Sequence, residues 1–114
     1  MVTLGPASIV VIPFPFSDLS ATKLRPAVVL AATGQDDWLL CQITSRAPID
    51  LTVVRLTNAN LKEGSLNVDS FARPMKLFTA NIDLIVRRVA ILDNDTFKAI
   101  LTVTIESLRR NMPN

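Results

Sequence analysis

Apolar residues fall in short runs along the first part of the chain, with turn-forming residues between them. Residues 8–14 are rich in β-branched side chains and end at two prolines, which cannot donate to a sheet ladder and therefore close a strand. Residues 26–32 and residues 38–44 form two further runs, each almost wholly apolar. Gly34 and the three polar residues that follow it lie between these two runs. The pattern predicts three successive strands, the last two joined as a hairpin.

The middle of the chain carries shorter runs of strand-forming residues. Residues 51–56, 65–68, 75–79 and 84–92 are each expected to form a strand, whereas residues 58–64 carry turn and loop residues. Such frequent, closely spaced strands favour a small β-barrel over alternating β-α-β units.

The hydrophobic period changes near the C-terminus. Asp93 or Asn94 is available as a helix N-cap. Apolar residues then recur at the spacing of one helical face, at Phe97, Ile100, Leu101, Ile105, Leu108 and Met112. We expect this helix to pack its apolar stripe on the barrel, which gives a mainly β fold with a C-terminal helix.

Composition narrows the class of protein. A chain of 114 residues with 49% hydrophobic composition suits a single domain spanning residues 1–114. Its apolar runs are far shorter than the roughly 18 residues needed to cross a bilayer, and the N-terminus carries no secretory pattern. Cys41 is the single cysteine and lies in an apolar run, so it is expected to be a buried thiol in a reducing compartment. These observations predict a cytoplasmic protein with no membrane partner.

The absence of histidine restricts the chemistry that the chain can perform. With no histidine, Ser-His-Asp and Cys-His catalysis, histidine-ligated zinc and a paired-histidine ribonuclease mechanism are all excluded. The net charge of +2 is too small to identify a nucleic-acid partner but is compatible with a local basic groove.

Two motifs stand at the ends of predicted strands. In residues 9–30 a strand leads into Pro-Phe-Ser-Asp, then a loop, then Arg-Pro-Ala and a hydrophobic strand. Residues 42–46 read Gln-Ile-Thr-Ser-Arg. The order and spacing of these motifs, together with residues 75–79, residues 85–92 and the final helix, resemble the MazF/PemK toxins over nearly the whole chain.

The resemblance implies a fold, an activity and partners. The fold would be an SH3-like barrel of the CcdB/MazF/PemK type, assembled as a homodimer. The activity would be sequence-selective cleavage of single-stranded RNA without a metal or other cofactor, as in an mRNA interferase. A cognate antitoxin would inhibit by occupying the RNA groove, and DNA binding would occur only in the complex with that antitoxin. The apolar composition also favours a dimer, because it exceeds what a small monomer easily buries.

Arg25 and Thr44 match the catalytic positions of this family. The Arg25 guanidinium is always charged and presents a planar fork of donors, which suits a phosphate that gains negative charge during transfer. The Thr44 hydroxyl would hold a phosphate oxygen while the ribose 2'-OH attacks in line. Taken without the resemblance, an arginine at this position is more often a solvated residue at a strand edge, and a Thr-Ser pair after a strand is more often just a turn.

Other residues near the two motifs are candidates for supporting the reaction or holding RNA. Asp18 is the nearest carboxylate to Arg25 and would orient it or act as a base, but it would also suit a turn cap; Ser45 offers a second hydroxyl. The candidates for contacts with RNA are Phe16, for stacking on bases, and the basic residues Lys23, Arg46, Arg73 and Lys76. Each of these basic residues is, on its own, an ordinary surface charge.

Two rival functions belong to other classes. A CcdB-like toxin has the same barrel and poisons DNA gyrase by protein contact, but it has no need of the Arg25 and Thr44 pair. An SH3-like module that binds peptides uses an aromatic groove, and the chain contains no tyrosine.

Overall fold

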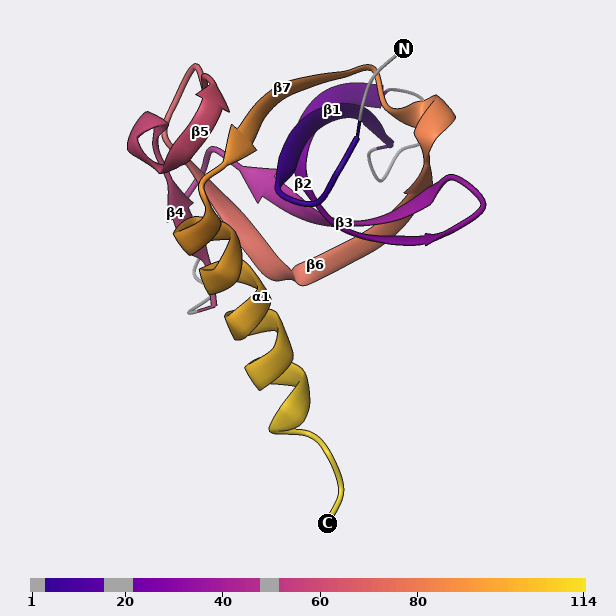
Figure 1. Ribbon diagram of the computed structural model, residues 1–114, viewed down its shortest axis with the longest axis vertical. Coiled ribbons are helices and arrows are strands. Elements are labelled where there is room, and N and C mark those ends of the chain that lie inside the picture. The colour runs from indigo at the N-terminus through magenta and orange to yellow at the C-terminus, as the bar shows by residue number, and fades with distance from the viewer. Residues whose placement is uncertain (1–3, 16–21, 48–51) are drawn as a thin grey trace.

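The computed structural model describes residues 4–15, 22–47 and 52–114. One seven-stranded antiparallel sheet curls into an open barrel with strand order β4-β6-β3-β2-β1-β7-β5, so that β4 and β5 are its edges (Figure 1). The α-helix α1 leaves the barrel beside β4 and β6. The elements are β1 (Ser8–Pro15), β2 (Thr22–Gly34), β3 (Asp37–Thr44), β4 (Val54–Leu56), η1 (Asn58–Asn60), β5 (Leu61–Gly64), β6 (Ser70–Asn81), η2 (Ile82–Leu84), β7 (Arg87–Leu92) and α1 (Asn94–Arg109).

The first three strands confirm the prediction made from the hydrophobic pattern. β1 and β3 match the predicted runs to within one residue at each end, while β2 is longer than predicted on both sides. The β2–β3 connection is a tight hairpin in which Gln35 and Asp36 have φ of +52° and +67°. Two successive left-handed residues are the conformation that matches the twist of a two-residue hairpin.

The middle of the chain departs from the predicted elements. Residues 58–64 were expected to be a loop but form η1 and the edge strand β5, which pairs with β7. Residues 65–68 were expected to be a strand but form the loop between β5 and β6. A strand exists only where another strand pairs with it, and this pairing partner cannot be read from local sequence.

The helix begins where it was predicted, and the first half of its apolar stripe, with Phe97, Ile100 and Leu101, packs on the barrel. Asp93 is the N-cap, and its carboxylate accepts a hydrogen bond from the Thr96 backbone N at 2.7 Å. The buried positions of α1 are Thr96, Ile100, Thr104 and Ser107. The sequence period predicted that the apolar stripe would pack along its whole length. This is wrong for its second half, because Ile105, Leu108 and Met112 are 48%, 61% and 70% exposed.

The core lies on both faces of the strands β1, β2 and β3. Ile9, Val28 and Ile43 face a cluster that includes Ile100 of α1. Their neighbours on the opposite face, including Val10, Ala27, Val29 and Leu40, face a second cluster. Because successive side chains alternate, a sheet buried on both faces needs continuous apolar runs, which is the pattern that these strands show.

Cys41 is a buried free thiol, as its apolar surroundings predicted. Burial raises the pKa of Cys41 from 9.0 to about 12. The thiol is therefore protonated at neutral pH and inert as a nucleophile. None of the helices in the described part of the chain is long and apolar enough to cross a membrane.

Candidate functional site

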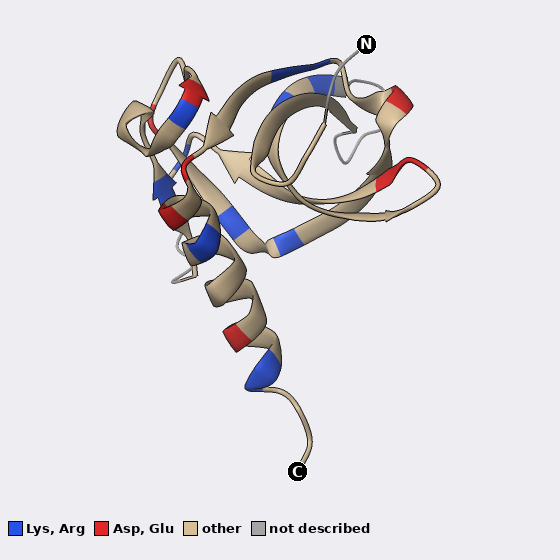
Figure 2. Cartoon of the chain, viewed as in Figure 1, with Lys and Arg blue, Asp and Glu red and all other residues tan. Residues whose placement is uncertain are grey.

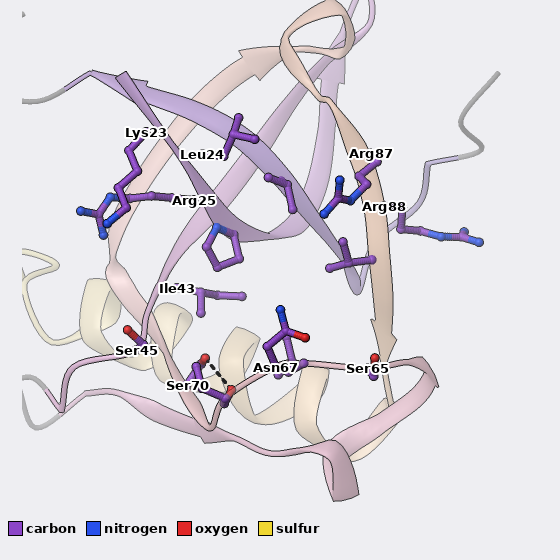
Figure 3. Close-up of a pocket in the computed structure, with 15 residues that line it drawn as sticks. Lys23, Leu24, Arg25, Ile43, Ser45, Ser65, Asn67, Ser70, Arg87 and Arg88 are labelled. Atoms are coloured by element: carbon purple, nitrogen blue, oxygen red, sulfur yellow. Dashed lines mark hydrogen bonds between the residues drawn. The ribbon is translucent and has the colours of Figure 1, made fainter. Parts of the chain in front are cut away.

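The alternation of β2 sends its charged and apolar side chains to opposite faces. Ala27 and Val29 belong to one core cluster, and Val28 belongs to the other. By the period of two, Lys23 and Arg25 lie on the face of Ala27, whereas Leu24 and Pro26 lie on the face of Val28. The close-up agrees with this, because Lys23 and Arg25 extend together away from the centre of the cavity that Leu24 borders (Figure 3).

Arg25 and Thr44 fall in matching positions of neighbouring strands. The β2–β3 ladder ends with Ala27 opposite Gln42. Continued by two residues, this register sets Arg25 opposite Thr44 and on the same face of the sheet. Both residues are partly exposed. The tertiary structure thus brings the ends of the two sequence motifs to one edge of the barrel.

The Thr44 hydroxyl has a local structural role as well. Its oxygen accepts a hydrogen bond from the backbone N of Arg46 at 3.2 Å, which holds the turn at the end of β3. The hydroxyl proton remains able to donate to another acceptor. Ser45 points elsewhere: it lines the cavity together with Ile43, while Thr44 does not.

β6 pairs with β3 on the side away from β2, and it contributes Arg73. Arg73 and Gln42 are paired in the β3–β6 ladder, so Arg73 shares the face of Gln42 and Thr44. The Arg73 Nε is buried and has no hydrogen-bond partner among the described residues. A buried donor without an acceptor is costly, and an acceptor from a ligand would relieve it.

A bulge in β6 separates Arg73 from Lys76. The register passes from Leu77 opposite Cys41 to Arg73 opposite Gln42, so the residues between them, which include Pro74, are unpaired. Proline has no N–H for the ladder, which accounts for the break. Lys76 is exposed on this bulge.

The aromatic residues serve mainly as core. Phe14 and Phe78 pack edge to face with ring centroids 4.8 Å apart, and both are partly buried. Phe71 is partly buried opposite Thr44. Phe16 and Asp18, a candidate stacking residue and a candidate base, lie outside the described residues.

A cleft with a volume of about 710 Å³ opens between β2, β7 and the loop from β5 to β6 (Figure 3). None of the described residues that line it carries a carboxylate. Four basic residues border it, namely Lys23, Arg25, Arg87 and Arg88. The basic segments of β2 and β7 accordingly lie near each other at the top of the barrel (Figure 2).

Sequence reasoning missed Arg87 and the polar residues of the 65–70 loop. Two adjacent arginines at the start of an apolar strand were the available signal for Arg87. Asn67 carried no signal, because residues 65–68 were expected to form a strand. Among the described residues, no group of three or more carboxylate or cysteine side chains is placed to hold a metal ion.

A family model described as the PemK-like, MazF-like toxin of type II toxin-antitoxin systems matches residues 6–108. The chain belongs to this family. No curated protein sequence gives a significant match to this PemK/MazF-like chain.

Solved structures show the same fold. A MazE-MazF crystal structure from Deinococcus radiodurans matches with a TM-score of 0.72 and 17% identity, over 91% of this chain and 94% of that one. The Mycobacterium tuberculosis toxin MazF-mt6 matches with a TM-score of 0.65 and 16% identity, over 88% and 96%. An endoribonuclease in complex with its cognate antitoxin, from Mycobacterial species, matches with a TM-score of 0.69 and 12% identity, over 97% and 100%. The expected mainly β barrel of the MazF/PemK type with a C-terminal helix is confirmed.

Proposed function

We propose that this PemK/MazF-like toxin is an endoribonuclease that cleaves single-stranded RNA without a metal ion. The observation that carries the proposal is the β2–β3 ladder, which ends with Ala27 opposite Gln42 and, continued by two residues, would bring Arg25 opposite Thr44 on the same face. Family membership supports it, and so does the endoribonuclease named among the proteins of the same fold.

The reaction needs little from the protein beyond positioning and charge. The ribose 2'-OH gives up its proton and its oxygen attacks the neighbouring phosphorus. The bond from phosphorus to the 5'-oxygen breaks, and that oxygen takes up a proton and leaves as a 5'-OH. The other product is a 2',3'-cyclic phosphate. Because the nucleophile belongs to the RNA, neither a covalent enzyme intermediate nor a metal-activated water is required.

Arg25 would contribute charge to the reaction, and Thr44 would position the phosphate. Arg25 stabilises the negative charge that develops on the phosphate, since its pKa above about 12 makes it a poor proton donor or acceptor. Thr44 holds a non-bridging oxygen so that attack is in line. Asp18 and Ser45 are the supporting candidates, with Asp18 as the base that takes the 2'-OH proton or as the group that orients Arg25.

RNA binding would follow the basic residues around the site. Lys23 and Arg73 share the face of Arg25 by strand alternation and the β3–β6 pairing. Lys76 is exposed on the bulge of β6, and Arg46 is exposed just after Thr44. Together with Phe16 they would hold the phosphates and bases flanking the cleaved bond. Cleavage should therefore weaken steeply as salt rises.

The proposed partners are a second copy of the chain and a cognate antitoxin. The exposed apolar residues Ile105, Leu108 and Met112 of the C-terminal region support a two-fold interface that includes α1 in addition to the barrel surface expected from sequence. The MazE-MazF structures of the same fold support an antitoxin, which would compete with RNA and would also be needed for any DNA binding.

The deciding experiment is cleavage of a long single-stranded RNA by the purified protein in excess EDTA. We expect cleavage to persist, with 2',3'-cyclic phosphate and 5'-OH ends. Strict dependence on an added divalent metal would refute the mechanism, and inhibition of DNA gyrase without RNA cleavage would instead favour a CcdB-like toxin.

A further inference from the structure

The cleft beside Arg25 contains two functional groups that the proposed reaction does not use. The side chains of Asn67 and Arg87 project into the space between β2, β7 and the 65–70 loop, while Arg88 points away from it (Figure 3). Leu24, at the opposite wall, is 51% exposed. The cleft therefore combines an apolar wall, an amide and a cation around one cavity.

The loop that carries Asn67 is anchored by its other residues. The Leu66 backbone N donates to the Asn58 Oδ1 at 2.7 Å, and the Ser70 Oγ donates to the Val68 carbonyl at 3.1 Å. Asp69 forms an ion pair with Arg55 at 2.9 Å. The Asn67 amide makes no hydrogen bond to any described residue, so it is not part of the contacts that hold the loop.

Of the two arginines of β7, one forms an ion pair and the other faces the cavity. Arg88 pairs with Glu63 at 3.3 Å, outside the cavity. Arg87 is exposed and has no ion pair within the described part of the chain. Arg87 faces a cavity whose described lining residues include no carboxylate, and a guanidinium in this position is suited to bind a phosphate.

We propose that this cleft receives the base of a nucleotide next to the cleaved phosphate, with Asn67 reading the base edge and Arg87 binding the adjoining phosphate. The proposal rests on the proposed function and adds a specificity site to it. The base would lie against Leu24 and Pro26, where the apolar wall offers a surface for its face, while an amide supplies a donor and an acceptor for its edge.

Size and position favour a nucleotide in this cleft. A volume of about 710 Å³ lies within the roughly 300–1,000 Å³ typical of small-ligand pockets. Arg25 borders the same cleft, although its side chain extends away from the cleft centre (Figure 3). A strand of RNA whose phosphate reaches Arg25 at this edge of the sheet would therefore place a neighbouring base at the cleft mouth. An acidic protein segment would also match Arg87, but it would leave the amide above the apolar wall without a role.

The test compares Asn67→Ala and Arg87→Ala with wild type, with Asn94→Ala and Lys98→Ala as controls on exposed positions of α1. The first measurement is the base preference around each cut in a long transcript, obtained by sequencing the new 5'-OH ends. The second is the affinity for an RNA oligonucleotide that carries 2'-O-methyl groups and cannot be cleaved.

Asn67→Ala should reduce the preference at a single position beside the cut by about 10-fold, the lower part of the range for losing one base contact. Arg87→Ala should weaken binding at all sequences and make it less dependent on salt. Unchanged base preference and unchanged RNA affinity in both variants would overturn the proposal and would favour an acidic protein segment as the ligand of the cleft. If wild type does not cleave RNA, the proposed function fails, and the affinity measurement still decides whether the cleft binds RNA.

Discussion

Replacing Gly64 by alanine should destabilise the fold at the strand that leads into the cleft. Gly64 has φ of +84° in the edge strand β5, opposite Ala90 of β7. A Cβ at Gly64 would lie 2.2 Å from the Val89 carbonyl oxygen and 2.6 Å from the Ala90 Cα. Both are backbone atoms of the paired strand, so a rotamer change cannot relieve the contact.

Two costs follow from this geometry. The left-handed backbone costs an alanine roughly 1–2 kcal/mol. In addition, β5 must move away from β7 by about 0.8 Å before the Cβ reaches the 3.0 Å below which real contacts essentially never fall. That shift weakens ladder hydrogen bonds, each with a net contribution of about 0.5–1.5 kcal/mol. We expect a loss of about 3 kcal/mol in the free energy of unfolding.

The other two glycines separate these costs. Gly34 has φ of +111° and open space around its Cβ position, so Gly34→Ala should show the backbone cost alone, about 1–2 kcal/mol. Gly5 has neither a positive φ nor a close contact, and Gly5→Ala should change stability by less than about 1 kcal/mol. Urea unfolding of the three variants measures the series. If Gly64→Ala costs no more than Gly34→Ala, the inferred contact between β5 and β7 is wrong.

The same substitution links stability to the proposed activity. The loop with Ser65 and Asn67 follows β5 directly, so a displaced β5 would move one wall of the cleft. Gly64→Ala should therefore lower RNA cleavage by the fraction that remains folded more than Gly34→Ala does. Equal specific activity in the two folded variants would show that the loop keeps its position when β5 shifts.

Three further predictions concern the site, the core and the assembly. Arg25→Ala should lower the cleavage rate by about 10²-fold or more without unfolding the protein, and Thr44→Ala should act similarly; near-normal rates in folded variants, measured on a fluorogenic RNA, would contradict the assignment. Because burial raises the Cys41 pKa from 9.0 to about 12, the folded state holds its thiol proton more tightly. The stability that this supplies is complete below pH 9 and is lost as pH rises towards 12, so urea unfolding of Cys41→Ala should lack this loss, and an equal decline in both proteins would refute it. Leu108→Glu should convert a dimer to a monomer in light scattering, and an unchanged dimeric mass would place the interface away from α1.

Local sequence determined the elements whose signals are local. The apolar runs of β1, β2 and β3 predicted strands because a sheet covered on both faces needs continuous hydrophobicity. Asp93 predicted the start of α1 because an N-cap acts on backbone groups within its own turn. The motifs around Arg25 and Thr44 likewise identified candidate residues before their positions in space were known.

Tertiary structure decided which distant residues meet. The pairing of β2 with β3 brings the strand ends that carry Arg25 and Thr44 to one edge of the barrel, and the curl of the sheet brings Arg87 and Asn67 to the cleft that Arg25 borders. The strand β5 exists because β7 pairs with it, although residues 58–64 carry loop-forming side chains.

The packed face of α1 also depended on its neighbours. The periodicity predicted that Ile105 and Leu108 would lie against the barrel, but the smaller Thr104 and Ser107 are buried in their place. Sequence period shows that a helix has an apolar stripe, but not which element covers it. The face of the helix that is buried depends on where β4 and β6 lie beneath it. The second half of the apolar stripe remains exposed in the single chain.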